Sequence, residues 1–152
     1  MSTYERSLSS PVGQLTIVAS ESGVMSLDWR QGRMDDTPLL RQTVEQVEEY
    51  FAGDRQDFTI PIRLRVSPFQ QSVCAAMAAI PFGETRTYGD LAKQLGVPAQ
   101  AIGQGCGGNP LPIIIPCHRV LGANGLGGFS GAGGVETKVA LLRHEGAAGL
   151  LI

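Results

Sequence analysis

The sequence predicts an α/β protein with two lobes. A small antiparallel sheet and one helix form the N-terminal lobe, and a mainly helical C-terminal lobe contains a helix-turn-helix. Two observations predict this division. Apolar and polar residues alternate through three short runs before residue 31, which is the pattern of half-buried strands. From Ser67 onward the apolar residues recur at helical spacing, and Gly96 separates two short helical segments.

The three alternating runs cover residues 3–10, 13–20 and 23–30. Turn residues separate them, Pro-Val-Gly after the first run and Glu-Ser-Gly after the second. Short connections of this kind join antiparallel neighbours, so the runs predict a three-stranded antiparallel sheet.

One helix follows the sheet. Thr37 can cap its N-terminus, Pro38 suits its first turn and Gly53 can end it. Residues 54–66 then form an extended connection. We therefore place the boundary between the lobes at 1–66 and 67–152.

The second lobe begins with Ser67 and Pro68, a cap and a first-turn residue. The apolar residues expected to face inward from this helix are Phe69, Val73, Met77 and Ile80.

The second helix of the helix-turn-helix is unusually rich in glycine, at positions 103, 105, 107 and 108. Each glycine costs a helix roughly 1 kcal/mol relative to alanine. Either a ligand or a neighbouring helix must come close to this backbone, and the pattern does not separate the two explanations.

A glycine-rich loop occupies residues 122–134, and a helix that ends at Gly146 follows it. Val135, Val139 and Leu142 are expected on its inner face.

Composition excludes several classes of protein. The chain is 43% hydrophobic and 17% charged, which is not the composition of a disordered protein. A net charge of −2 gives no overall basic field, although residues 67–152, with five Lys/Arg and four Asp/Glu, are the better candidate for a polyanion-binding face. No apolar run is long enough to span a membrane and no secretory signal is present, so we expect a cytoplasmic protein without a membrane partner.

Three cysteines, Cys74, Cys106 and Cys117, share no CxxC spacing, and their number is odd. A disulfide framework and a structural zinc site are therefore not expected. No metal and no cofactor is predicted.

Cys117 follows an apolar run and precedes His118 and Arg119. A buried cysteine is usually a small apolar residue, but a nearby base or positive charge would make it a nucleophile. Two histidines, His118 and His144, are candidates for the base. Glu145 is the best candidate for the carboxylate that orients it. The residues themselves leave these alternatives open.

The segment "NPLPIIIPCHRVLG" (109–122), the glycine-rich loop and "LLRHEG" together resemble the O6-alkylguanine-DNA alkyltransferases. The resemblance covers nearly the whole chain. It implies direct-reversal DNA repair, in which an alkyl group moves irreversibly from O6-alkylguanine, and from O4-alkylthymine, to a cysteine that works once. The implied partner is alkylated double-stranded DNA, bound through the minor groove with the damaged base flipped into a pocket. A monomer is expected.

The resemblance also implies the roles of individual residues. Cys117 would accept the alkyl group, His118 would act as base through a water, and Glu145 would orient His118. Asn109 would hold the turn that shapes the site, and Tyr88 would hydrogen-bond the leaving guanine.

The residues implied in substrate or DNA binding are Ala99, Gln100, Ala101, Gly103, Arg119, Phe129 and Ser130. Gln100 stands where the family carries an arginine that fills the place of the flipped base. Two alternatives follow from this difference. The chain could bind damaged DNA without transferring the alkyl group, or its cysteine could act on a small alkylated molecule outside DNA.

Overall fold

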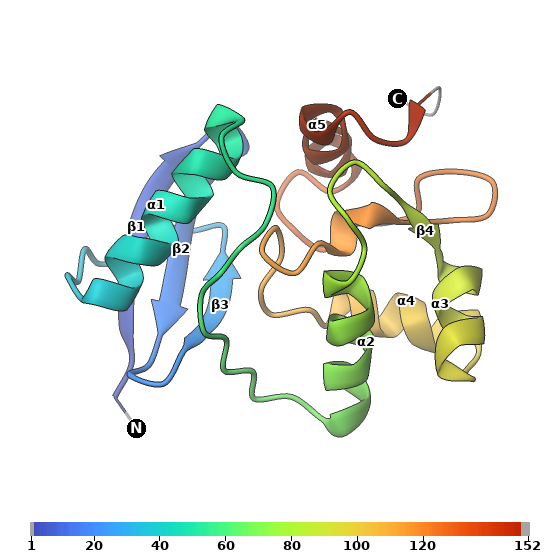
Figure 1. The fold of residues 1–152 in the computed structure, drawn as a ribbon, viewed down its shortest axis with the longest axis horizontal. Coiled ribbons are helices and arrows are strands. Elements are labelled where there is room, and N and C mark those ends of the chain that lie inside the picture. Colours follow the sequence, from blue (N-terminus) through green and yellow to red (C-terminus); the bar gives the residue numbers. More distant parts are fainter. Residues whose placement is uncertain (1, 150–152) are drawn as a thin grey trace. The chain divides into compact units, whose positions relative to one another are not determined.

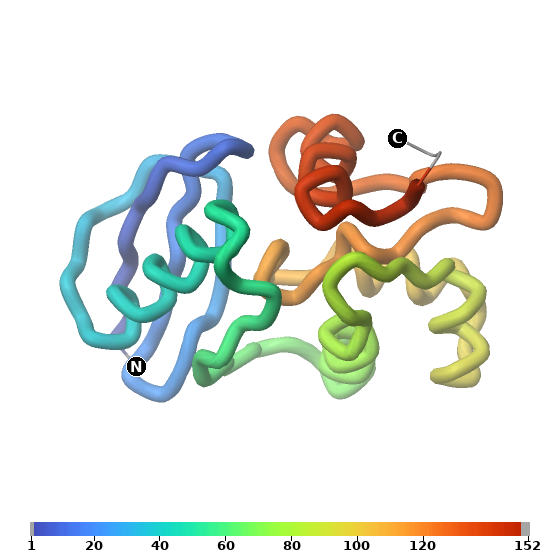
Figure 2. The backbone as a smooth tube through the Cα atoms, turned by 45° about the horizontal axis from the view of Figure 1, so that its top comes forward, coloured from blue at the N-terminus to red at the C-terminus, as the bar shows by residue number. Residues whose placement is uncertain are grey.

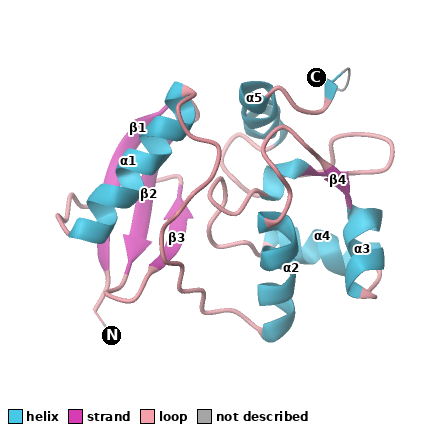
Figure 3. Ribbon diagram, viewed as in Figure 1, coloured by secondary structure: helices cyan, strands magenta, loops and turns pink. Residues whose placement is uncertain are grey.

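A computed structural model of the chain describes residues 2–149 (Figure 1). The chain divides into two units, Met1–Arg65 and Val66–Ile152. All strands of the three-stranded sheet lie in the first unit, and four of the five α-helices lie in the second (Figure 3).

The sheet of the first unit consists of β1 (Tyr4–Ser10), β2 (Gly13–Ala19) and β3 (Val24–Asp28). The strands pair antiparallel in the order β1-β2-β3, and the β1–β2 turn closes with Ser10 opposite Gly13. The predicted sheet is thus confirmed, with strand ends within two residues of the expected ones.

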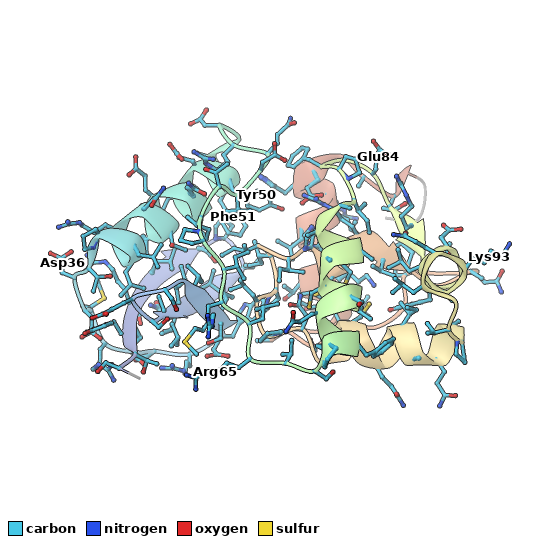
Figure 4. All side chains as sticks on the ribbon, turned by 60° about the horizontal axis from the view of Figure 1, so that its bottom comes forward. Asp36, Tyr50, Phe51, Arg65, Glu84 and Lys93 are labelled. Carbon is cyan, nitrogen blue, oxygen red and sulfur yellow. The ribbon has the colours of Figure 1, made fainter. Side chains whose placement is uncertain are left out.

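Helix α1 (Pro38–Ala52) packs on one face of this sheet (Figure 1). The Thr37 hydroxyl accepts a hydrogen bond from the Leu40 amide at 3.1 Å, and Gly53 ends the helix in the left-handed conformation. Tyr50 of α1, labelled in Figure 4, is fully buried and belongs to the core of this unit.

The extended segment after α1 also makes backbone hydrogen bonds with β3. The Val24 amide donates to the carbonyl of Pro61 and the Arg63 amide donates to the carbonyl of Val24, each at 2.8 Å. Residues 61–63 therefore run beside the start of β3, as the tube in Figure 2 shows.

The second unit contains α2 (Pro68–Ala78), β4 (Arg86–Thr87), α3 (Tyr88–Leu95), α4 (Ala99–Gly107), a single 3-10 turn, η1 (Cys117–Arg119), β5 (Val120–Leu121) and α5 (Val135–Glu145). Its short strands β4 and β5 pair in parallel. Because Tyr88 follows β4 and Cys117 shortly precedes β5, this pairing holds the start of α3 close to the 3-10 turn.

Helices α3 and α4 form the expected helix-turn-helix. Thr87 caps α3 in a reciprocal capping box with Asp90, and Gly96 ends it in the left-handed conformation. Among residues 2–149, no helix is long and apolar enough to cross a membrane.

Two predicted inner faces are wrong in part. Phe69 on α2 is 39% exposed and Val135 on α5 is 45% exposed. The buried face of α5 instead contains Thr137, Lys138, Leu141, Leu142 and Glu145. Buried hydrogen bonds and an ion pair hold the polar members of this face, so apolar spacing could not reveal it.

Candidate active site

Asn109 closes the loop that leads to Cys117. Its side-chain amide donates to the carbonyl of Ile115 at 2.9 Å, and its side-chain oxygen accepts from the amide of Leu111 at 3.0 Å. Between these residues, Ile113 adopts a positive φ of 75°, which is costly for a β-branched side chain. The buried loop and the two bonds from Asn109 hold this conformation, and they fix the direction in which Cys117 leaves the loop.

Cys117 begins the single 3-10 turn η1. The Arg119 amide donates to the carbonyl of Pro116 at 3.0 Å, so the chain turns directly after the proline. In an extended segment, neighbouring side chains would point to opposite sides. The turn removes that constraint, and Cys117, His118 and Arg119 are all buried.

A carboxylate from α5 organises the residues beside Cys117. Nε2 of His118 lies 2.7 Å from Oε2 of Glu145. Nε and Nη2 of Arg119 donate to the two oxygens of the same carboxylate at 2.8 and 3.0 Å. Nη1 of Arg119 donates to the carbonyl of Ile80 at 2.6 Å. These bonds join His118, Glu145 and Arg119 into one hydrogen-bonded network, and all three side chains are buried.

The hydrogen bonds determine the tautomer of His118. A carboxylate only accepts hydrogen bonds, so Nε2 carries the hydrogen. Nδ1 is also buried and has no hydrogen-bond partner within the described part of the chain. Burial lowers the pKa of His118 although the hydrogen bond to Glu145 opposes this. The ring is therefore neutral near pH 7, and Nδ1 carries a free lone pair, as a base requires.

Cys117 opens onto a cavity of about 330 Å³. The cavity lies between α4, the start of α3 and the glycine-rich loop. Its lining residues are Tyr88, Gly103, Cys106, Gly107, Cys117, Gly128, Phe129 and Ser130.

The two titratable groups proposed to act in the cavity are both protonated at rest. Burial raises the pKa of the Cys117 thiol, although a hydrogen bond from Asn109 and the charge of Lys138 oppose this. Burial also raises the pKa of Tyr88, so its phenol remains a hydrogen-bond donor. The thiol thus needs a base during the reaction, whereas the phenol needs none to donate.

Lys138 is a residue of this site that the sequence patterns did not reveal. Its side chain is fully buried, and Nζ donates to the carbonyls of Val120 at 2.6 Å and Gly128 at 3.0 Å. It therefore ties the glycine-rich wall of the cavity to β5. Its Nζ also lies 5.9 Å from the centre of the Tyr88 ring. One signal could have found it, because Lys138 and Glu145 are seven residues apart and so share a helix face.

The structure separates the two explanations for the glycines of α4. A Cβ on Gly105 would lie 2.8 Å from Cγ1 of Val73, so this glycine permits close packing against α2. A Cβ on Gly103 or Gly107 would meet nothing within 4 Å among the described residues, although both line the cavity. Internal packing does not require these two glycines, and they leave their part of the cavity wall without side chains.

The remaining predicted residues lie on two parts of the second unit. Phe129 and Ser130 line the cavity with Cys117. Ala99 and Gln100 are exposed on α4, and Ala101 is half-buried.

For Arg119 the structure corrects the prediction. The resemblance grouped this residue with the DNA contacts, but its guanidinium is buried and bound to Glu145 and Ile80. It therefore positions Glu145. The choice of base is also narrowed, because His118 is hydrogen-bonded to Glu145, whereas the ring of His144 lies edge-on to Phe82 with ring centres 6.3 Å apart.

Comparison with known families agrees with this geometry. Residues 68–147 match the model described as "6-O-methylguanine DNA methyltransferase, DNA binding domain", and residues 3–64 match the ribonuclease-like domain of the same methyltransferase. The chain belongs to the 6-O-methylguanine DNA methyltransferase family. This confirms the resemblance drawn from the sequence.

Relatives within the 6-O-methylguanine DNA methyltransferase family cover almost the whole chain. The methylated-DNA–protein-cysteine methyltransferase of Mycobacterium tuberculosis is 41% identical, covering 93% of this chain and 92% of its own. The constitutive methylated-DNA–protein-cysteine methyltransferase of Bacillus subtilis is 38% identical, covering 93% and 94%. The crystal structure of M. tuberculosis OGT in complex with DNA matches with a TM-score of 0.82 at 39% identity, covering 93% of this chain and 92% of that one. The predicted fold class is thus confirmed.

Proposed function

We propose that this chain repairs DNA by moving the alkyl group of O6-alkylguanine, and of O4-alkylthymine, to the sulfur of Cys117. One observation carries the proposal: the thiol faces a cavity while a neutral, buried histidine stands beside it with a free ring nitrogen. The names of the relatives and the DNA complex of the M. tuberculosis protein support it.

The first step removes the proton of the Cys117 thiol. Nδ1 of His118 accepts this proton through one bridging water, and Nε2 keeps its hydrogen bond to Glu145. The carboxylate stabilises the imidazolium that forms. Arg119 holds both oxygens of that carboxylate, so Glu145 and Arg119 act as positioning residues.

The second step transfers the alkyl group. The Cys117 thiolate attacks the alkyl carbon, a sulfur–carbon bond forms, and the bond from that carbon to O6 of guanine breaks. The electron pair stays with the base, which takes up a proton and becomes ordinary guanine. The Tyr88 hydroxyl donates a hydrogen bond to the leaving base and stabilises the charge that develops on it.

The product explains why the protein would act once. A thioether is not opened by thiol exchange, which needs a disulfide. The chain is therefore both catalyst and reactant. A protein consumed on one base has no need of a symmetric partner, so a monomer is proposed. The cytoplasm is the proposed compartment.

The helix-turn-helix is the proposed DNA-binding element, with α4 in the minor groove. The exposed residues of α4 are small or uncharged, and they include Ala99, Gln100, Gly103 and Gly107. Small residues allow a helix to lie close to the floor of a narrow groove. The damaged base would then be flipped past Gly103 into the cavity, where Phe129 offers a stacking face and Ser130 a hydrogen bond.

The test uses a duplex oligonucleotide with a single O6-methylguanine. After incubation with the protein, nucleoside analysis of the strand should show guanine in place of the modified base. Cys117→Ser should abolish the conversion, and His118→Gln should slow it without abolishing DNA binding. Release of free base or cleavage of the strand would instead indicate a different kind of repair, and binding without conversion would indicate a lesion-recognition protein.

A further inference from the structure

A second thiol, that of Cys106, lines the cavity of Cys117. Cys106 lies on α4 and is 8% exposed, while Cys117 begins η1 and is 5% exposed. The third cysteine, Cys74, is also buried, but it lies on α2 and is not among the residues that line the cavity. The repair chemistry proposed above uses one thiol and leaves Cys106 without a role.

The two thiols in the cavity have different surroundings. Cys117 stands beside the base His118. Cys106 has a weak contact to the sulfur of Met77, at 3.5 Å, and burial raises its pKa to about 12. A charge on Cys117 raises this pKa further, so the two sulfurs are near enough for one charge to affect the other. Cys117 is thus the thiol that reacts first, and Cys106 is a protonated thiol that lines the same cavity.

We propose that Cys106 and Cys117 form a reversible disulfide when the protein meets a peroxide, so that Cys106 protects the alkyl acceptor from permanent oxidation. The two residues border the same cavity. Formation requires the two Cα atoms to come within about 7 Å of each other.

The chemistry takes two steps and needs hydrogen peroxide as oxidant. The Cys117 thiolate attacks one peroxide oxygen, the oxygen–oxygen bond breaks, and the released hydroxide takes up the thiol proton to give water and a sulfenic acid. The Cys106 sulfur then attacks the Cys117 sulfur, a sulfur–sulfur bond forms, and the hydroxyl of the sulfenic acid leaves with the Cys106 proton as a second water. The protein loses two hydrogen atoms in total.

The disulfide would change the fate of the oxidised acceptor. A sulfenic acid without a neighbouring thiol is oxidised further to a sulfinic acid, which reductants such as dithiothreitol do not reverse. A disulfide is reduced by such thiols, which restores the acceptor. Cys106 would therefore turn a permanent loss of Cys117 into a temporary one.

The experiment treats the full chain with hydrogen peroxide, blocks free thiols and maps the peptides without reduction. The expected result is a linked pair of peptides containing Cys106 and Cys117, lighter by two hydrogen atoms and separated by dithiothreitol. Cys74→Ala is the matched control and should form the same link. Cys106→Ala should accumulate the sulfinic acid on Cys117 and recover several-fold less free thiol after dithiothreitol.

Three outcomes would overturn the proposal: the parent accumulates sulfinic acid as fast as Cys106→Ala, Cys117 is linked to Cys74, or the link joins two chains. If Cys106→Ala does not fold, the peptide map of the parent decides by itself. These readouts concern the cysteines alone, so they remain interpretable if alkyl transfer from DNA fails.

Discussion

The guanidinium of Arg119 donates two hydrogen bonds to the carboxylate of Glu145, from Nε to Oε1 at 2.8 Å and from Nη2 to Oε2 at 3.0 Å. This pair joins η1 to the last residue of α5 inside the second unit. Because His118 shares the same carboxylate, the orientation of the base depends on an ion pair that does not itself face the cavity.

Replacing Glu145 by Gln should impair both folding and alkyl transfer. It leaves the Arg119 guanidinium buried without its counter-charge, a change that typically costs about 3–5 kcal/mol. It also removes the charge that stabilises His118 when the ring accepts a proton, so the single-turnover transfer rate should fall on the order of a hundredfold. Urea unfolding and quenched transfer assays measure the two effects. Arg143→Gln, an exposed change on the same helix, should alter neither by much. An unchanged rate in Glu145→Gln would contradict the role of Glu145 in stabilising the protonated ring of His118.

The pH dependence of transfer should follow the lowered pKa of His118. Its pKa lies below the usual value of 6.5 because the ring is buried. The ring therefore stays neutral, and the rate should hold as pH falls to about 6.5 and decline only below it. A rate already halved above that pH would contradict the assignment of the base.

The lowered pKa of His118 also predicts how the free energy of unfolding changes with pH. At pH values between the pKa of His118 in the folded chain and its pKa in the unfolded chain, the unfolded chain binds more protons at this residue than the folded chain does. The stability that His118 contributes is therefore fully present above pH 6.5 and is lost as pH falls through the folded pKa. The difference in free energy of unfolding between the parent and His118→Asn should accordingly shrink as the pH falls.

Lys138→Met tests the buried lysine. The substitution leaves the carbonyls of Val120 and Gly128 without their donor, at a cost of about 1–3 kcal/mol for each carbonyl left unpaired. It also removes a charge that lowers the pKa of both His118 and Cys117. The decline of the rate at low pH, which His118 sets, should therefore begin at a higher pH, and the rate at neutral pH should fall on the order of tenfold because the thiol is harder to deprotonate. A merely structural lysine would lower stability and leave the pH profile in place. Lys93→Met is the control, because Lys93 points away from the body of the helix (Figure 4).

Gln100→Arg tests whether duplex DNA is the substrate. Of the five cations in residues 67–152, Arg119 and Lys138 are buried and bonded, and Arg86 is paired with Glu84 at 3.2 Å. DNA binding should therefore depend weakly on salt. An arginine at position 100 should speed transfer from a duplex. It should also steepen the slope of the logarithm of the DNA-binding constant against the logarithm of the salt concentration by roughly 0.9 for each phosphate that it contacts.

The control for Gln100→Arg is Gln71→Arg, which adds the same charge on an exposed position of α2. It should leave the duplex rate unchanged. Equal rates for a duplex and for a free O6-alkylguanine compound in the parent and in Gln100→Arg would favour a small-molecule substrate instead.

Local signals predicted much of the fold. Thr37 with Pro38 and Ser67 with Pro68 marked helix starts that the structure confirms, because caps and first-turn prolines act within a few residues. The resemblance of residues 109–122 identified the family. Helix caps, first-turn prolines and this motif each depend on residues that are close together in the sequence.

The parts that the sequence did not reveal depend on contacts between distant residues. Arg119 binds Ile80, which lies 39 residues away, and Lys138 binds Val120, which lies 18 residues away. A lysine or arginine in a sequence usually indicates a solvated surface. Both residues are buried because carboxylate or carbonyl oxygens from other elements surround them, and spacing along the chain does not encode that arrangement.

The most direct test of alkyl acceptance by Cys117 is the mass of the protein after reaction with an excess of duplex DNA carrying O6-methylguanine. We predict a gain of one methyl group per chain, located by peptide mapping on Cys117, with no gain in Cys117→Ser. A methyl group on Cys106 or Cys74, or many lesions repaired by each unmodified chain, would contradict this prediction. So would no gain at all while the Cys117 thiol still reacts with a small electrophile.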